Sequence, residues 1–149
     1  MRETSSQPAR ILVIEDNSAD VMLLRHALDE HGEAYDLEVL QDGGDGLAFV
    51  AAQRGSPGEP VPCVMVLDLH LPKHDGVSIL QALKKAPELH HVRVVALSSF
   101  VSPREEAQMR ALGVRLCLEK PPDLDGWIAL AGMILEICRE PVGSPVFAG

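Results

Sequence analysis

The stretch CVMVLD, residues 63–68, decides the fold expected for this chain. Residues 63–67 are apolar without interruption, which predicts a short β-strand buried on both faces. Similar apolar, β-rich runs occur at RILVI (10–14), DLEVL (36–40), RVVAL (93–97) and RLCL (115–118). Four of the five runs have the composition of strands buried on both faces, which is typical of a parallel sheet covered by helices on each side.

The segments between these runs have the spacing of amphipathic helices. One begins with the capping box Ser102-Pro103-Arg104-Glu105 and ends at Gly113. In the others, apolar residues recur every three or four positions, as at Val21, Leu24 and Leu28, at Val77, Leu80 and Leu83, and at Trp127, Leu130, Ala131, Ile134 and Cys138. Five strands alternating with five helices predict a doubly wound α/β fold with a five-stranded parallel sheet and helices on both faces.

The composition restricts the possible partners. The chain has 149 residues and a formal net charge of −9, which opposes binding to nucleic acid or to an anionic membrane because both need cationic side chains. The N-terminal segment has no apolar leader core, and the longest apolar stretch, around 127–135, is too short to span a bilayer. We therefore expect one cytoplasmic domain without nucleic-acid or membrane partners.

The three cysteines, Cys63, Cys117 and Cys138, form no CxxC pair. Cys63 and Cys138 lie in apolar runs, where a free thiol packs as a small apolar side chain. We expect all three to be structural.

Polar side chains follow four of the predicted strands. They are Glu15 and Asp16, Asp68, Ser98 with Ser99, and Glu119 with Lys120. Each alone is explained as a turn former or a helix cap, but the carboxyl ends of parallel strands meet at one edge of the sheet. Three carboxylates brought together there would repel one another unless a cation such as Mg²⁺ lay between them.

A phosphoryl group would complete such a site. Lys120 and the Ser98 hydroxyl would then contact the phosphoryl oxygens, and Asp68 would act as a nucleophile that becomes an acyl phosphate. The sequence contains no glycine-rich P-loop, which disfavours nucleotide binding.

Four pieces of the chain resemble the receiver domains of two-component response regulators, in the family's order. They are ILVIEDNSAD (11–20), VMVLDLHLPKHDG (64–76), VVALSS (94–99) and LEKP (118–121). The resemblance covers residues 9–140, between a flexible segment at 1–8 and a tail at 141–149, and is strongest to small single-domain regulators partnered with phytochrome-type histidine kinases. It implies a flavodoxin-like fold.

The resemblance also implies roles for individual residues. Asp68 is the expected phosphoacceptor, and Ser98 and Lys120 contact the phosphoryl group. Asp16, Asp68 and the His70 carbonyl are expected to bind Mg²⁺, with Glu15 acting through a metal-bound water. A cis Lys120-Pro121 peptide bond is expected, and Asp75-Gly76 matches the turn that opens the third helix.

Three residues depart from the family pattern. Cys117 stands where the family often has an aromatic residue that moves on activation. His70 and Phe100 flank the phosphoryl site at positions that tune hydrolysis. Because an apolar Phe100 would exclude water, we predict a long-lived phosphorylated state.

The sequence thus predicts a response regulator that is not an enzyme beyond its own phosphorylation and dephosphorylation. Its expected partner is a histidine kinase or a phosphotransfer protein, and its output is a protein contact. Ile128, Leu135 and Ile137 fall off the apolar stripe of the last helix, which suggests a homodimer or partner interface or else scattered surface residues. The face expected to carry the output comprises the helix after Ser102, the strand at 115–118 and the last helix.

Two alternatives remain from the sequence. One is a receiver-like interaction module that works without phosphate. The other is a Mg²⁺-dependent phosphohydrolase, which is disfavoured because the second acid expected two residues after Asp68 is replaced by His70.

Overall fold

The computed structural model describes residues 7–53, 61–71 and 76–141. Most of the predicted N-terminal segment 1–8, most of the tail 141–149 and the predicted turn residue Asp75 lie outside these ranges. The strands are β1 (Ala9–Ile14), β2 (Tyr35–Leu40), β3 (Val64–Asp68), β4 (Arg93–Ser98) and β5 (Leu116–Glu119). The helices are α1 (Ser18–Glu30), α2 (Gly43–Gln53), α3 (Gly76–Lys84), the short 3₁₀-helix η2 (Pro87–Leu89), α4 (Pro103–Ala111) and α5 (Leu124–Cys138).

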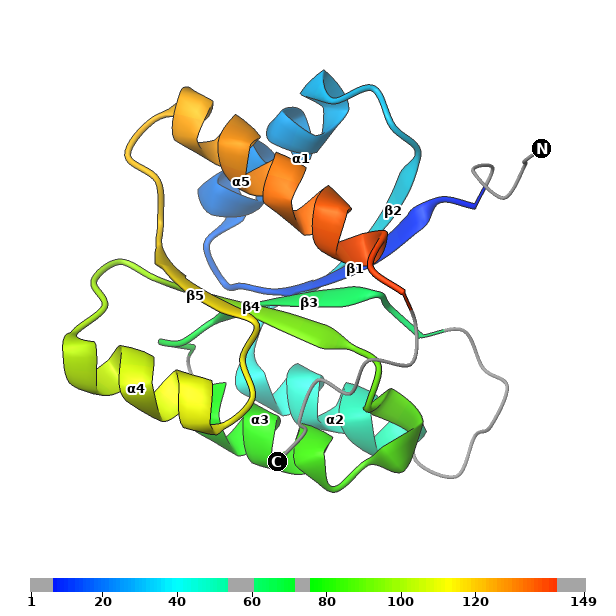
Figure 1. Cartoon of the computed structure of the whole chain (residues 1–149), viewed down its shortest axis with the longest axis vertical. Helices are drawn as coiled ribbons and strands as arrows, with labels where there is room; N and C mark the ends of the chain where they lie inside the picture. The colour runs from blue at the N-terminus through cyan, green and yellow to red at the C-terminus, as the bar shows by residue number, and fades with distance from the viewer. Residues whose placement is uncertain (1–6, 54–60, 72–75, 142–149) are drawn as a thin grey trace.

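The five strands form one parallel sheet in the order β2-β1-β3-β4-β5. Helices α1 and α5 cover one face, and α2, α3 and α4 cover the other (Figure 1). This is the flavodoxin-like strand order, and it confirms the predicted doubly wound fold.

The run at 63–67 belongs to a strand buried on both faces because successive side chains of a strand point to opposite sides. Met65 and Leu67 pack into the core beneath α2, α3 and α4, whereas Val64 and Val66 pack into the core beneath α1 and α5. All five residues of β3 are buried. By contrast, β2 lies at the sheet edge and its residues are half-buried or exposed.

Helix α5 buries more of its surface than one stripe. Leu135 and Ile137 are each only 3% exposed, and the half-buried Ile128 packs against the same core. The helix lies against both the sheet and the neighbouring α1, so its buried arc is wider than the stripe expected from spacing alone. The suggestion of an exposed interface is therefore wrong for Leu135 and Ile137, whereas Ile128 is only half-buried.

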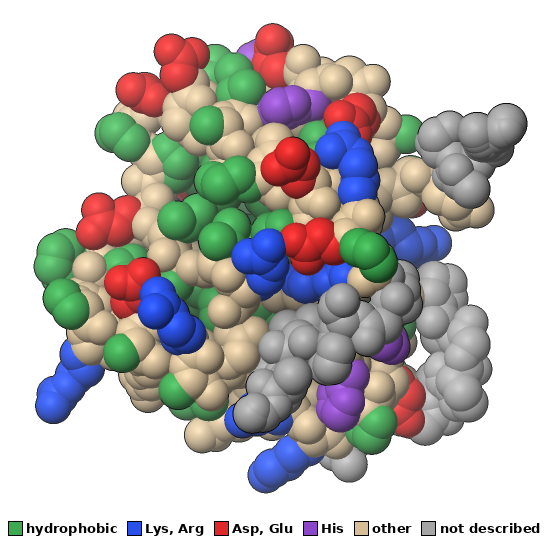
Figure 2. All heavy atoms as spheres, viewed as in Figure 1, with side chains coloured by type: hydrophobic (Ala, Val, Ile, Leu, Met, Phe, Trp, Pro, Cys, Tyr) green, Lys and Arg blue, Asp and Glu red, His purple; other side chains and the backbone are tan. Residues whose placement is uncertain are grey.

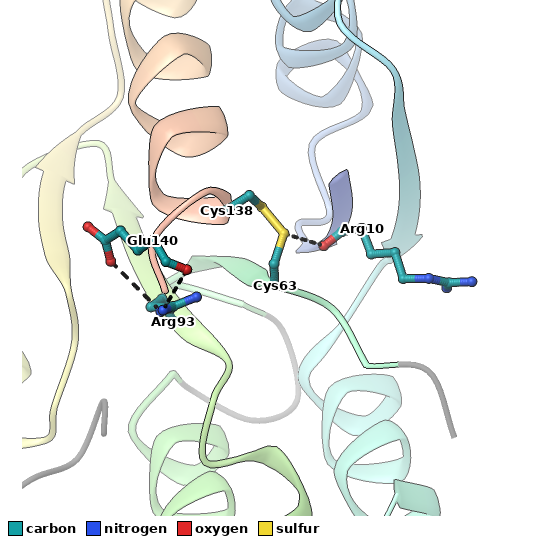
Figure 3. Close-up of a disulfide and its surroundings, with 5 residues drawn as sticks. All are labelled: Arg10, Cys63, Arg93, Cys138 and Glu140. Carbon is teal, nitrogen blue, oxygen red and sulfur yellow. Dashed lines mark hydrogen bonds and ion pairs between the residues drawn. A yellow bond between two sulfur atoms is a disulfide. The ribbon is translucent and has the colours of Figure 1, made fainter. Parts of the chain in front are cut away.

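Cys63 and Cys138 form a disulfide, which corrects the expectation of three free thiols (Figure 3). The two Cα atoms lie 5.2 Å apart, although 75 residues separate them in sequence. Cys63 lies just before β3 and Cys138 ends α5, so the crossover from sheet to helix brings both to the amino edge of the sheet. Cys117 remains a free, half-buried thiol.

A buried arginine also fastens the end of α5. The guanidinium of Arg93, at the start of β4, donates hydrogen bonds to the carbonyls of Glu140 (3.2 Å) and Pro141 (2.7 Å). The Glu140 carboxylate lies 3.8 Å from Arg93 Nε and accepts a hydrogen bond of 2.7 Å from Arg115. Figure 3 shows Arg93 and Glu140 close to the disulfide, so two kinds of link meet at this end of the helix.

Within the described ranges, no helix has both the length and the apolar character needed to cross a membrane.

Candidate functional site: an acidic pocket with a lysine

The predicted site residues meet at the carboxyl edge of the sheet because the strands that carry them are neighbours. Glu15 and Asp16 follow β1, and Asp68 ends the adjacent β3. One carboxylate oxygen from each of the three lies within 4.8 Å of the others. Lys120 follows β5, and its backbone N–H donates a hydrogen bond of 2.8 Å to the carbonyl of Ser98 at the end of β4.

Asp68 is held between a backbone donor and a cation. Its Oδ1 accepts a hydrogen bond of 3.0 Å from the His70 N–H, and its Oδ2 lies 3.6 Å from Lys120 Nζ. The residue is only 5% exposed. Such a carboxylate has a fixed orientation, and its Oδ2 faces the Lys120 ammonium at more than hydrogen-bond distance.

Glu15 is buried beside it and is similarly fixed. Its Oε2 accepts a hydrogen bond of 3.1 Å from the Asn17 N–H, while its Oε1 lies 3.1 Å from Lys120 Nζ. Burial and then the adjacent Asp68 carboxyl raise the pKa of Glu15 from 4.5 to about 7, despite the opposing contributions of Asn17 and Lys120. Burial is therefore the main reason that the charged form of Glu15 is disfavoured, and Lys120 offsets it only in part.

The donor set fits a hard divalent cation. Carboxylate oxygens at this spacing are the ligands that Mg²⁺ prefers, and the exposed Asp16 gives the cluster an open side toward solvent. No other group of three or more metal-ligating side chains occurs among the residues that the structure describes.

Lys120 has a third carboxylate partner, which the sequence reasoning missed. Asp20, in the first turn of α1, lies 2.8 Å from Lys120 Nζ through its Oδ2. Although burial lowers the pKa of the Lys120 ammonium, its hydrogen bonds with Asp20 and Glu15 raise it above the usual value overall. The only signal in the sequence was an acidic residue one helical turn after the Glu15-Asp16 pair.

Ser98 is fully buried but does not point at Asp68 in this structure. Its hydroxyl donates a hydrogen bond of 2.8 Å to the Phe100 carbonyl and lies 3.3 Å from the Phe100 N–H. The side chain therefore closes the loop that follows β4.

Comparison with known proteins shows the family to which the chain belongs. The family described as the response regulator receiver domain matches residues 11–130. The response regulator Rcp1 of Synechocystis sp. is 35% identical over 145 residues, which is 97% of this chain and 99% of Rcp1. The chain belongs to the response regulator receiver domain family.

Solved receiver structures superpose on nearly the whole chain. The phosphorylated cyanobacterial phytochrome response regulator RcpA matches with a TM-score of 0.79 and 26% identity, over 93% of this chain and 100% of RcpA. The Mn²⁺-bound form of Rcp1 matches with a TM-score of 0.76 and 30% identity, over 93% of this chain and 99% of Rcp1. This receiver domain therefore has the fold of phosphorylated and metal-bound relatives.

Membership of the family places the chain in two-component signalling. It implies a histidine kinase as partner and a signalling role rather than catalysis on a separate substrate. Receiver domains bind Mg²⁺ at an acidic pocket, and the cluster of Glu15, Asp16 and Asp68 is compatible with this. Neither the phosphate-independent module nor the phosphohydrolase is favoured by these relatives.

One expectation taken from the family is wrong for this receiver domain, and the premise of a second prediction does not hold. The Lys120-Pro121 peptide bond is trans, since the described residues contain no cis peptide bond. For an X-Pro bond the two forms differ little in intrinsic free energy, so the local sequence alone does not fix the choice. Phe100 is 69% exposed, so its ring forms no packed cover over Asp68, and the predicted long phosphoryl lifetime loses its structural basis.

The other two departures lie near α4. The exposed His70 ring has its Nε2 3.7 Å from a carboxylate oxygen of Glu105, in the first turn of α4. Cys117 is half-buried on β5 beside a cavity of about 160 Å³, which Arg110 and Leu118 also line. Burial, and then the carboxylates of Glu105 and Glu106, raise the pKa of the Cys117 thiol.

Proposed function

We propose that Asp68 is the phosphoacceptor of this response regulator and that Ser98 and Lys120 contact the transferred phosphoryl group. The observation that carries the proposal is the buried Asp68 carboxylate, which lies beside Glu15 and Asp16 and 3.6 Å from Lys120 Nζ at the carboxyl edge of the sheet. The proposed receiver unit spans residues 9–140.

In the proposed reaction, an Asp68 oxygen attacks the phosphorus of a phosphohistidine on the kinase or on a phosphotransfer protein. A P–O bond forms, the P–N bond breaks, and the imidazole leaves. Asp16, Asp68 and the His70 carbonyl would hold Mg²⁺, with Glu15 acting through a metal-bound water, and the bound ion would supply positive charge beside the phosphoryl oxygens. Lys120 supplies the second positive charge, and the buried setting strengthens its attraction to the phosphoryl group.

Ser98 would need to change partners during activation. Its hydroxyl is bonded to Phe100 in this structure, and rotation toward the phosphoryl group would release the loop that precedes α4. A shift of this loop alters the face made by α4, β5 and α5. Cys117 has no aromatic ring that could move on β5, so the output would depend on a shift of the loop after Ser98 or on oligomerisation.

The same face supports a proposed homodimer or partner contact. β5 is an edge strand, and Leu116, Cys117 and Leu118 on it are half-buried. Figure 2 shows hydrophobic side chains gathered between α5 and β5, with charged side chains around them. Light scattering of the unphosphorylated and phosphorylated protein tests this contact, and a monomer in both states at high concentration would exclude the homodimer.

We also propose a cytoplasmic location and a phytochrome-type kinase as partner. The second proposal is supported by the likeness to RcpA, which is described as a phytochrome response regulator. The Cys63–Cys138 disulfide opposes a location in a reducing cytoplasm, where such bonds are rare. Alkylation of both cysteines in freshly lysed cells would support the cytoplasmic location, and protection of both would contradict it.

The proposed phosphotransfer is tested by intact mass spectrometry after incubation with acetyl phosphate. We expect one phosphoryl adduct that requires Mg²⁺ and is absent from Asp68→Asn. An adduct that persists in Asp68→Asn would place the acceptor elsewhere. A folded wild-type protein that takes no phosphoryl group from acetyl phosphate or from a kinase would overturn the proposal in favour of a phosphate-independent module.

A further inference from the structure

Lys120 is closest to a residue outside the acidic cluster. Its Nζ lies 2.8 Å from Asp20 Oδ2, 3.1 Å from Glu15 Oε1 and 3.6 Å from Asp68 Oδ2. The proposed acceptor is thus the most distant of the three carboxylates. The separation from Asp68 exceeds an ordinary hydrogen bond, whereas the separation from Asp20 does not.

Asp20 is held in place by the helix on which it lies. Asn17 caps α1, and its side-chain oxygen accepts hydrogen bonds from the backbone N–H groups of Ala19 and Asp20. The Asp20 and Lys120 side chains are only 18% and 15% exposed. Their contact is therefore formed between groups that have lost most of their hydration, which strengthens the attraction.

Asp20 does not belong to the group of carboxylates that can share a cation. That group comprises Glu15, Asp16 and Asp68 in the described part of the chain. Binding of a metal ion by this group therefore does not explain why Asp20 contacts Lys120.

The position of Lys120 controls access to Asp68. Without Asp20, the ammonium group would be drawn toward the Asp68 carboxylate, because only 3.6 Å separates the two opposite charges. A direct hydrogen bond between them, shorter than the present 3.6 Å, would reduce the nucleophilicity of Asp68. It would also have to break before phosphorus could approach.

We propose that Asp20 is a positioning residue for phosphoryl transfer, because its carboxylate holds Lys120 Nζ short of a direct hydrogen bond to Asp68 and keeps the ammonium available to the incoming phosphoryl oxygens. The inference rests on the proposed role of Asp68 and adds a residue to it. Asp20 contacts neither the phosphoryl group nor the metal and acts through Lys120.

The test measures the rate of phosphorylation by acetyl phosphate at saturating Mg²⁺. Trp127, the only tryptophan in the chain, lines the small cavity shared by Glu15, Asp20 and Asp68 and provides a fluorescence signal. Displacements of about 1 Å at a reacting centre cost up to about 100-fold in rate. We expect Asp20→Ala to lower the rate by about tenfold or more. Asp20→Asn keeps an acceptor oxygen without the charge, so its rate should lie between those of the wild type and of Asp20→Ala.

A double-mutant cycle separates positioning from a general structural role. In the Lys120→Ala background, Asp20→Ala should change the remaining rate by less than about twofold, because the residue through which it acts is gone. Asp125→Ala is the matched control, since Asp125 is also an acidic residue in the first turn of a helix. This control should leave the rate unchanged.

Each outcome decides a different point. If the wild type is phosphorylated on Asp68 and folded Asp20→Ala reacts at the same rate, the positioning role is overturned and the proposed function stands. An equal loss in both backgrounds would also overturn it. If Asp20→Ala fails to fold, Asp20→Asn provides the same comparison. A wild type that forms no phosphoryl adduct would overturn the proposed function together with this inference.

Discussion

Removal of the Cys63–Cys138 disulfide should strongly destabilise the receiver domain. The bond closes a loop between residues 75 apart in sequence. In the chain-entropy treatment, a loop of that length restricts the unfolded chain by about 4.5 kcal/mol at 25 °C. Measured values for disulfides are usually lower, so we expect the free energy of unfolding to fall by about 2 to 4.5 kcal/mol. A domain with a total stability of about 5–15 kcal/mol would lose a large part of it.

Urea unfolding followed by Trp127 fluorescence measures this loss, because that side chain is buried in the core. With a denaturant slope of about 2 kcal/mol/M, the midpoint should fall by about 1 to 2 M when a reductant is added. The double variant Cys63→Ser with Cys138→Ser should unfold at the lower midpoint with or without reductant. Cys117→Ser retains the disulfide and should respond to reductant as the wild type does.

Two results would refute this reasoning. Three reactive thiols in the denatured, unreduced wild type would show that the pair is not bonded. If the bond is present but its reduction leaves the midpoint unchanged, loop closure does not contribute to the stability of this domain.

Three further predictions concern single side chains. Without Mg²⁺, Glu15 keeps its proton up to about pH 7 in the folded protein but loses it near pH 4.5 in the unfolded chain. Its contribution to stability therefore falls as the pH rises between these values. In urea titrations with EDTA, the free energy of unfolding of Glu15→Gln should change less with pH over this range than that of the wild type. Arg93→Met leaves the Glu140 and Pro141 carbonyls without their donor and should cost about 1–3 kcal/mol of unfolding free energy, measured by urea denaturation. Leu135→Ala should cost about 2–5 kcal/mol without changing the mass found by light scattering, whereas a change in oligomeric state at constant stability would restore the interface interpretation.

The strands could be predicted from the sequence because runs of consecutive apolar residues indicate strands that are buried on both faces. The run at 63–67 has apolar side chains for both faces, and the observed β3 begins one residue later and ends at Asp68. The convergence of Glu15, Asp68 and Lys120 followed from topology alone, since parallel strands bring their carboxyl ends to one edge.

The remaining features depend on packing that the sequence pattern does not encode. The partners Cys63 and Cys138 lie in different elements with no fixed spacing, and only the crossover of α5 brings them together. The contact between Asp20 and Lys120 depends on the orientation of two side chains that are 100 residues apart in sequence. The hydroxyl of Ser98 has two possible sets of partners, and no residue pattern selects between them.

The disulfide and the Arg93 hydrogen bonds at the end of α5 determine how this helix can move. Its 15 residues span about 22 Å, and its first turn begins four residues after Lys120. Because the disulfide and Arg93 fix the other end to β3 and β4, a displacement of the Lys120 end becomes a rotation about Cys138. A displacement of about 1 Å there corresponds to a rotation of about 2.5° along a helix of this length. The amplitude of this rotation would be greatest beside the proposed phosphorylation site and would vanish at Cys138, at the opposite edge of the sheet.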